Sequence, residues 1–288
     1  MERVASVAEW RAHAEAVRAR GRRVGLVPTM GALHAGHESL VRRARAAGDV
    51  VFTTVFVNPR QFNNAADLER YPRTPDEDAS RAHAAGTDVL VEPALEEMWP
   101  LGDATPTTVS VGPVGAVLEG VDRPGHFDGV ASVVAKLLVV TGPCRVYLGE
   151  KDYQQLIAMR QMVRDLSFDV EVVGCPIVRE ETGLALSSRN QRLSAAGREV
   201  ALGLSAALAS AADPASASEL RARMRAVMDE AGVDVAYAEV VDPATLAPLS
   251  DAQSGAGRAL LAGVVEGVRL LDNAAVAVIE GSHRATGH

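Results

Sequence analysis

The hydrophobic and polar positions of residues 1–173 alternate between short apolar runs and longer segments with helical spacing. Short apolar runs bounded by turn residues are typical of buried strands, whereas apolar positions three and four residues apart indicate amphipathic helices. The pattern predicts strands at Val24–Val27, Val50–Val57, Val89–Val91, Thr107–Val111, Arg145–Leu148 and Val170–Val173, and helices at 4–20, 75–86, 129–140 and 154–166, with a short loop-and-helix region at 67–71.

Strands that alternate with helices in this way predict a parallel sheet with helices on both faces. We therefore expect an α/β fold with a Rossmann-like, doubly wound parallel sheet. In such folds ligands bind beyond the carboxyl ends of the strands.

The pattern changes after residue 180. Helices are expected at 195–212 and 219–231, and strands at 235–241, 257–265, 269–272 and 275–279. These elements predict a second, smaller α+β domain, with residues 1–178 in the first domain, residues 179–288 in the second, and a frayed tail at 282–288.

Composition is that of a soluble globular protein, with 288 residues of which 48% are hydrophobic and 23% charged. Cys144 and Cys175 are the only cysteines and read as small core residues, which argues against a disulfide scaffold and for a reducing compartment. The first residues do not resemble a signal peptide, and no run is apolar enough to span a membrane. We expect a cytoplasmic protein.

The net charge of −8 disfavours a surface that coats nucleic acid, but it leaves room for a small anion held by local cations. Only two of the 29 basic residues are lysines, Lys136 and Lys151. A lysine in so arginine-rich a chain suggests a need for a compact ammonium group, and this argument applies equally to both.

The segment 24–40 carries the strongest functional signal. A predicted strand leads through Gly31 and Gly36 into a helix, with His34 and His37 at the junction. Amide groups and the positive end of the helix dipole favour an anion there, and a glycine allows close approach to a ligand. We interpret the segment as a phosphate-binding corner. The alternative is an ordinary turn with two surface histidines, and metal binding is disfavoured because no cysteine or carboxylate completes a ligand set.

Other polar residues occupy comparable junctions. Gln61 follows the second strand, and its amide can both donate and accept hydrogen bonds. Lys151 stands at a helix start, where a cation is unfavourable unless an anion is shared with it. Asp152 fits the N-cap position, and Gln155 is expected to point toward the same edge of the sheet.

Two further loops offer groups that suit a phosphate. Ser187, Ser188 and Arg189 combine hydroxyls with a guanidinium, although a plain capped loop explains them equally well. Arg123 adds another cation beside a predicted helix start. The sequence shows no Ser–His–Asp or Cys–His arrangement, so the pattern indicates a nucleotide site beside a small polar substrate.

Six ordered motifs between residues 24 and 190 resemble the pantothenate synthetase (pantoate–β-alanine ligase) family, within the His-x-Gly-His nucleotidyltransferase superfamily. The motifs are Pro28–His37, Asn58–Phe62, Tyr71–Arg73, Arg123–Gly129, Gly149–Gln155 and Leu184–Asn190, and Arg269–Asn273 resembles the family's C-terminal strand.

The resemblance implies condensation of pantoate with β-alanine through pantoyl adenylate, with ATP converted to AMP and pyrophosphate. It places His34, His37, Lys151 and Arg189 on the phosphates, with His37 as the family's suggested proton donor. The implied ATP site comprises Met30, Gly31, His34, Gly36, His37, Gly149, Glu150, Lys151, Asp152, Val178, Leu186, Ser187, Ser188 and Arg189.

The resemblance also assigns pantoate and β-alanine to Gln61, Gln155 and Asn58, and it implies a homodimer whose smaller domain closes over the ATP site. Mg²⁺ is expected with the ATP phosphates. Asp76–Asp78 could anchor it, although a solvated helix start explains these acids better. Leu186 replaces a methionine of many relatives, and Ala66 replaces a glutamate that often precedes Asp67.

Two other functions stay open on sequence grounds. One is a nucleotidyltransferase that acts on a phosphorylated acceptor. The other is a non-catalytic nucleotide-sensing or RNA-associated protein, which the acidic composition disfavours.

Overall fold

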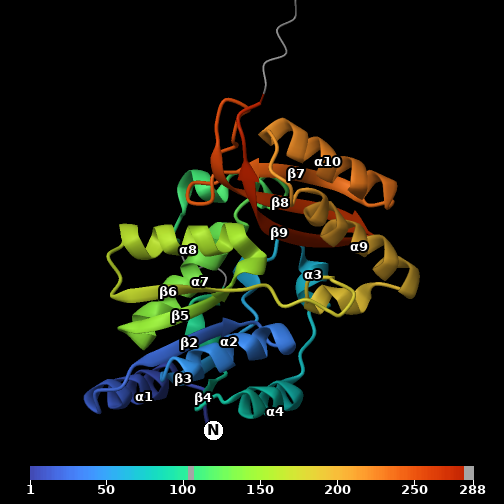
Figure 1. Ribbon diagram of the computed structural model, residues 1–288. Coiled ribbons are helices and arrows are strands. Elements are labelled where there is room, and N and C mark those ends of the chain that lie inside the picture. The colour runs from blue at the N-terminus through green and yellow to red at the C-terminus, as the bar shows by residue number, and fades with distance from the viewer. Residues whose placement is uncertain (103–106, 282–288) are drawn as a thin grey trace, which may run out of the picture. The chain divides into compact units, whose positions relative to one another are not determined.

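The computed structural model describes residues 1–102 and 107–281, and the chain divides after Val178 into two units, Met1–Val178 and Arg179–His288 (Figure 1). The predicted frayed tail, 282–288, lies outside the described residues.

The first unit is built on a six-stranded sheet in which every neighbouring pair is parallel. Its spatial order is β1-β4-β3-β2-β5-β6, so β2 to β6 follow the Rossmann-like, doubly wound arrangement that the sequence predicts. The strands are β1 (Glu2–Val4), β2 (Val24–Thr29), β3 (Val50–Val55), β4 (Val89–Val91), β5 (Cys144–Gly149) and β6 (Val170–Cys175).

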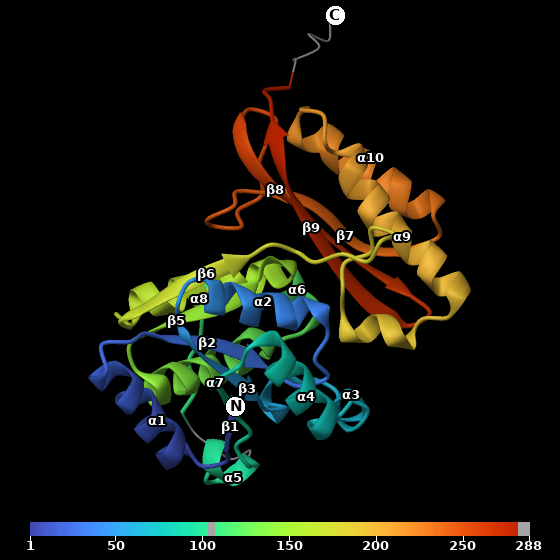
Figure 2. The ribbon, with the colours of Figure 1, turned by 60° about the horizontal axis from the view of Figure 1, so that its bottom comes forward.

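Helices cover both faces of this sheet (Figure 2). Helices α2 and α4 contact each other on one face, where α2 packs on Val27, Val51 and Tyr147, while α1, α7 and α8 form the other layer. The helices are α1 (Val7–Ala19), α2 (Ala35–Ala46), α3 (Ala65–Glu69), α4 (Pro75–Ala85), α5 (Leu95–Met98), α6 (Glu119–Asp122), α7 (His126–Thr141) and α8 (Tyr153–Asp165), with 3₁₀ turns η1 (Pro59–Gln61), η3 (Gly112–Gly115) and η4 (Glu150–Asp152).

The order of the strands reverses between the neighbours β2 and β5. The chain leaves β2 for α2 on one face and leaves β5 for η4 and α8 on the other. The carboxyl ends of β2 and β5 therefore form the topological switch point, where doubly wound sheets bind their ligands.

Two predicted elements of this unit are wrong. Residues 4–20 were expected to be one helix, but Glu2–Val4 forms the edge strand β1, paired with β4, before α1 begins at Val7. Thr107–Val111 forms no strand, because side chains of α7 take its amide groups: Val109 donates to Ser132 Oγ at 2.9 Å and Val111 to Asp128 Oδ1 at 3.3 Å.

Element boundaries also differ around prolines and glycines. Pro28 lies inside β2 instead of ending it, and the pairing of β2 with β5 has already stopped at Leu26. Helix α7 begins at His126, three residues before the predicted start, because Gly125 adopts φ +78° just ahead of it. Helix α2 begins at Ala35, so His34 is its N-cap.

The second unit is an antiparallel three-stranded sheet, ordered β7-β8-β9, with two packed helices. Its core contains Leu204 of α9, Leu220 and Met224 of α10 and Leu261 of β8. The elements are η5 (Ser188–Arg192), α9 (Ala195–Ser210), α10 (Ala217–Glu230), β7 (Asp234–Val241), β8 (Gly255–Val265) and β9 (Val268–Val278). This is the smaller α+β arrangement that the sequence predicts.

Strand β9 is continuous, whereas the sequence suggested two short strands separated near residue 273. Asp272 and Asn273 interrupt the apolar pattern, but both are buried within the strand. Arginines pair with them there: Arg179 donates to Asp272, and Arg258 donates to Asn273. Polar residues inside a strand thus mark internal hydrogen bonds in this case, not a turn.

Both cysteines are buried and unpaired, as expected for small core residues, and burial raises the pKa of Cys144 to about 12 and of Cys175 to about 11. Among the helices that the structure describes, none combines the length and apolar character needed to cross a membrane.

Candidate active site

His34 and His37 form an interlocked pair at the start of α2. His34 is the N-cap, and its Nδ1 accepts a hydrogen bond from the Gly36 amide at 3.1 Å. His37 Nδ1 accepts one from the His34 amide at 3.4 Å, and the two ring centroids lie 4.1 Å apart. Because each Nδ1 is an acceptor, each neutral ring carries its proton on Nε2, which is the atom left to donate to a ligand.

This pairing corrects one part of the sequence interpretation. The amide groups at this helix start were expected to bind phosphate, but the imidazole of His34 caps the amides of Gly36 and His37 itself. Side chains also take the amides of residues 31–34, as described below. The corner therefore presents imidazole N–H groups and the helix dipole, with these backbone amides already used.

Both histidines are neutral at physiological pH. Burial, followed by the neighbouring His34, lowers the pKa of His37 to about 3. Burial and then the ammonium group of Lys151 lower the pKa of His34. Lys151 and Asp152, which follow β5, act on both rings in opposite directions: the ammonium group lowers the pKa of each histidine and the carboxylate raises it.

The two lysines have different roles. Lys151 lies in η4, with its side chain 17% exposed and its Nζ 3.3 Å from Asp152 Oδ1. Asp152 occupies the expected N-cap position of α8, but its side chain makes no capping hydrogen bond. Lys136 instead donates to the Glu97 and Met98 carbonyls at the end of α5 and stacks near Trp99. Of the two, Lys151 alone belongs to the switch point.

Gln61 is fixed by other residues that the sequence singled out. Its Oε1 accepts from Asn58 Nδ2 at 3.1 Å, and its Nε2 donates to Met30 Sδ at 3.0 Å. One N–H and one lone pair of the amide remain for a ligand. The structure therefore brings Gln61 beside Met30, which follows β2 directly.

Asn58 was expected to contact substrate, but its buried amide is saturated within the protein. Besides Gln61, its Nδ2 donates to the Gly129 carbonyl at 3.2 Å, and its Oδ1 accepts from Trp99 Nε1 at 3.1 Å and from the Arg60 amide at 3.4 Å. Asn58 therefore orients Gln61. The sequence signal for this role was its place shortly after β3, directly before a proline.

The remaining candidates of the first unit are Arg123, Gln155, Gly149, Glu150 and Val178. Arg123 reaches the Gln61 carbonyl at 3.4 Å, beside His126 Nδ1 at 2.8 Å, so it braces η1. Gln155 is partly buried near the start of α8, whereas the adjacent Gln154 is buried and bonds to residues of η3 and α6. Gly149 and Glu150 lie at the end of β5 and in η4, and Val178 is partly buried at the end of the unit.

In the second unit, Leu186, Ser187, Ser188 and Arg189 are all partly buried. Ser187 is the N-cap of η5, and its hydroxyl accepts from the Arg189 amide at 3.3 Å, so it does cap the loop. A tight turn precedes them, in which Gly183 adopts φ +96° and Arg179 pairs with Ala185.

The acids of the run 76–78 have different surroundings. Asp78 is buried against the loop that follows β2, and Glu77 pairs with Arg81 at 3.0 Å. Within residues 1–102 and 107–281, no group of three or more His, Cys, Asp or Glu side chains is arranged to hold a metal ion.

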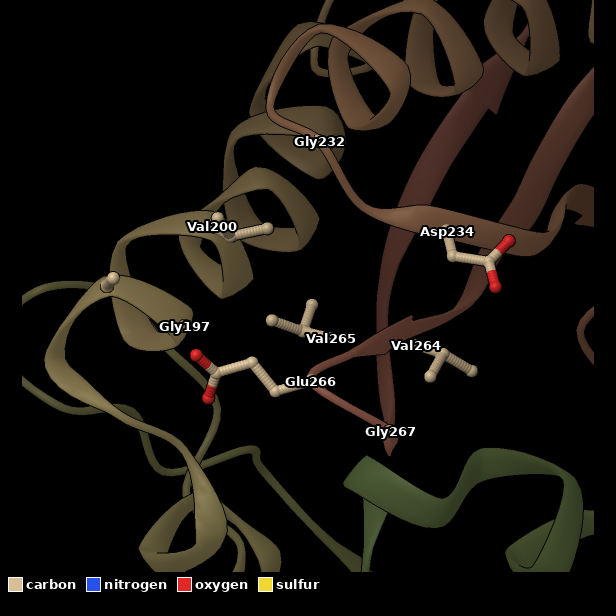
Figure 3. A pocket seen from close by; sticks show the side chains of 9 residues that line it. Gly197, Val200, Gly232, Asp234, Val264, Val265, Glu266 and Gly267 are labelled. Atoms are coloured by element: carbon tan, nitrogen blue, oxygen red, sulfur yellow. The ribbon is translucent and has the colours of Figure 1, made fainter.

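One cavity of about 400 Å³ lies wholly in the second unit (Figure 3). None of the candidate residues lines it, and its charged side chains are Asp234 and Glu266. Glu266 accepts hydrogen bonds from the amide and hydroxyl of Ser194, the N-cap of α9, and these bonds lower its pKa. An acidic cavity of this kind does not suit a phosphate.

Comparisons with known proteins point to one family. Residues 2–275 match the family model described as pantoate–β-alanine ligase. A pantothenate synthetase from Cereibacter sphaeroides is 50% identical over 273 residues, which cover 93% of this chain and 97% of that protein. Another from Nocardia farcinica is 50% identical over 266 residues, covering 91% of this chain and 82% of that protein.

Solved structures give the same result. The pantothenate synthetase of Thermus thermophilus matches with a TM-score of 0.86 and 45% identity, covering 95% of this chain and 99% of that chain. The pantoate–β-alanine ligase of Francisella tularensis, complexed with beta-gamma ATP and β-alanine, matches with a TM-score of 0.78 and 33% identity, covering 95% and 97%. Sequence and topology thus agree, and the chain belongs to the pantoate–β-alanine ligase family.

Proposed function

We propose that this protein condenses pantoate with β-alanine to form pantothenate, converting ATP to AMP and pyrophosphate through a pantoyl adenylate. The observation that carries the proposal is the switch point of the first sheet. There the neutral pair His34 and His37 follows β2, and Lys151 follows the neighbouring parallel strand β5.

The first step is attack of a pantoate carboxylate oxygen on the α-phosphorus of ATP. The new P–O bond forms while the bond to the bridging oxygen breaks, and pyrophosphate leaves with that electron pair. Such a step needs alignment and charge compensation, and no protein nucleophile. Lys151 supplies positive charge, and the imidazole Nε2–H groups donate hydrogen bonds. Because the pKa of His37 is about 3, we assign it as a neutral hydrogen-bond donor and not as an imidazolium acid.

In the second step the amine of β-alanine attacks the acyl carbon of the adenylate. The carbon–oxygen bond to AMP breaks, AMP leaves, and the nitrogen loses a proton. We place Gln61 against pantoate and near the amine, because Asn58 and Met30 hold its amide while leaving a donor and an acceptor available. Gln155 is the second pantoate residue; its side-chain amide has no hydrogen-bond partner among the described residues.

The remaining assignments follow from family membership together with local chemistry. Mg²⁺ accompanies the ATP phosphates, and the protein acts as a homodimer. Residues 1–178 bind nucleotide and pantoate, and Ser187, Ser188 and Arg189 of the second unit bind phosphate. The residues assigned to ATP are Met30, Gly31, His34, Gly36, His37, Gly149, Glu150, Lys151, Asp152, Val178, Leu186, Ser187, Ser188 and Arg189.

The decisive experiment measures products with purified protein, ATP and Mg²⁺. AMP release should require both pantoate and β-alanine, and pyrophosphate release should require pantoate alone. A nucleotidyltransferase would need a phosphorylated acceptor for pyrophosphate release, and a nucleotide sensor would bind ATP without turnover. Sedimentation of the same sample tests the dimer.

A further inference from the structure

A buried carboxylate holds the loop that leads to the histidine pair. Asp78 lies in the first turn of α4, and only 1% of its surface is exposed. Its Oδ1 accepts from the Leu33 amide at 2.6 Å, and its Oδ2 accepts from the Ala32 amide at 3.1 Å. Asp residues are almost never fully buried unless they are paired, and here two consecutive backbone amides provide the partners.

The loop has an unfavourable backbone that needs such support. Gly31 adopts φ +85° and Ala32 adopts φ +49°, a region that residues with a Cβ rarely occupy. Asp78 Oδ2 also packs so closely that a Cβ on Gly31 would lie 2.9 Å from it. The carboxylate therefore fixes both the path of the backbone and the residue type that the path can accept.

Side chains bind four consecutive amides of this loop. Gly31 donates to Thr29 Oγ1 at 3.2 Å, Ala32 and Leu33 donate to Asp78, and His34 donates to His37 Nδ1. Leu33 directly precedes His34, the N-cap of α2. Asp78, on α4, thus fixes the backbone directly before the histidine pair of α2, and the two helices contact each other.

Thr74 completes the arrangement. It is the N-cap of α4, yet its hydroxyl makes no capping hydrogen bond and instead donates to Asp78 Oδ2 at 3.2 Å. A residue type that normally caps its own helix here serves the buried carboxylate. By contrast, Asp76 in the same helical turn is exposed.

We propose that Asp78 is a positioning residue for adenylate formation: it holds the Gly31–Leu33 backbone so that His34 and His37 meet the phosphates of ATP. The proposal rests on the proposed function, and it replaces the reading of this acid as a magnesium anchor. Asp78 acts through the loop and touches neither ATP nor the metal.

The test is the Asp78→Asn variant, assayed by pantoate-dependent ATP–pyrophosphate exchange. Asparagine keeps the shape but sets an NH₂ group against a backbone N–H, so kcat/KM for ATP should fall by about tenfold or more. The Mg²⁺ concentration for half-maximal exchange should stay within about twofold of wild type, and so should KM for β-alanine, which is measured separately by AMP release in the complete reaction. Asp76→Asn is the matched control, since it removes the same charge from the same turn without touching the loop.

A folded Asp78→Asn protein with wild-type constants would overturn the proposal, and so would activity restored by excess Mg²⁺, which would make Asp78 a metal ligand. If Asp78→Asn does not fold, Thr74→Val replaces it: a fall in kcat/KM for ATP that Thr74→Ser rescues supports the proposal, and equal constants for the two variants overturn it. Wild-type protein that releases no pantoate-dependent pyrophosphate would instead refute the proposed function.

Discussion

The Thr29–His37 segment of the first unit and the Arg179–Asn190 segment of the second each contain residues that we propose to bind phosphate, but the two segments are stabilised differently. In the first, backbone amides donate to Thr29, Asp78 and the two histidines. In the second, ion pairs fix the chain: Arg179 binds Asp272 through two hydrogen bonds of 2.6 and 2.9 Å.

In the second segment, further ion pairs extend to the residues that we propose to bind phosphate. Glu180 accepts from Arg198 at 3.2 Å and from Asn190 Nδ2 at 3.2 Å, and Arg198 donates to the Asn190 carbonyl. The side chains of Glu180 and Arg198 are 25% and 39% exposed, whereas Asp78 is almost fully buried. In the first segment, neutral imidazole donors are held by buried hydrogen bonds. In the second, the cation Arg189 follows ion pairs that are exposed to water and salt.

The largest effect is expected from the donors of the first segment. Because its loop amides are already used, the imidazole of His37 has no substitute, and His37→Ala should lower kcat/KM for adenylate formation by about a hundredfold or more. Lys151→Ala should have a loss of similar size. Pantoate-dependent pyrophosphate release measures both. His83→Ala, an exposed histidine on α4, is the control. Undiminished release by His37→Ala would contradict the assignment.

The second segment should show its largest effect in stability. Asp272→Ala leaves the guanidinium of Arg179 and the amide of Asn273 without their buried acceptor. Removing one partner of a buried pair costs about 3–5 kcal/mol, and the partial exposure of Arg179, 31% of its side chain, places this case near about 3 kcal/mol. Urea unfolding with hydrogen exchange over β9 measures it.

The control for this prediction is Asp234→Ala, because Asp234 is exposed at the start of β7. Its effect should stay within about 0.5 kcal/mol. Equal stability of the two variants would mean that the ion pair does not hold the segment.

The fold was predictable where local periodicity and packing agree. The β2–α2 and β5–α8 units follow their apolar pattern, and their carboxyl ends lie at one edge because the sheet is parallel. The sequence therefore placed the histidine pair and Lys151 at the edge where the structure has them. Strand β1 was missed because its three residues pair only with β4, and so short an edge strand has almost no period to detect.

The supporting contacts were harder to predict than the site itself. Asp78 reads as an ordinary acid in the first turn of a helix, and only its place on the same face as Ala82 and Ala85, the other buried residues of α4, marks it as internal. The partners of Asn58 come from residues up to 71 positions away. Pairing over such distances depends on tertiary packing, which the local pattern does not contain.

The next largest effect is on the pH dependence of stability, which should come from the first segment and not from the second. The pKa of His37 is lowered in the folded protein to about 3, below its unfolded value of about 6.5. Between these two pKa values the unfolded chain binds a proton that the folded protein does not. The stability that neutral His37 contributes is therefore fully present above pH 6.5 and is lost as the pH falls toward 3. The loss reaches at most about 1.4 kcal/mol per pH unit.

Urea unfolding at pH 7, 6 and 5 tests this linkage. His37→Gln should weaken the dependence, because glutamine keeps a hydrogen-bond acceptor but does not titrate. Asp272→Asn should leave the dependence unchanged, because residues 179–281 contain no histidine. A pH dependence that is identical in wild type and His37→Gln would show that other groups determine acid stability.

The smallest expected effect tests whether the ion pairs of the second segment are more exposed to salt than the hydrogen bonds of the first. Glu180→Gln keeps an acceptor for Asn190 but removes the charge that faces Arg198, and for a pair this exposed we expect a loss of at most about 1 kcal/mol at low salt. Salt screens exposed charges, so the difference from wild type should shrink as NaCl rises from 0.05 to 1 M, values chosen to span Debye lengths from about 14 to 3 Å. The loss of stability in Asp78→Asn, which comes from buried hydrogen bonds, should not shrink. If both defects responded equally to salt, the distinction between an ion-paired and a hydrogen-bonded segment would fail, because screening acts only on charges that the solvent reaches.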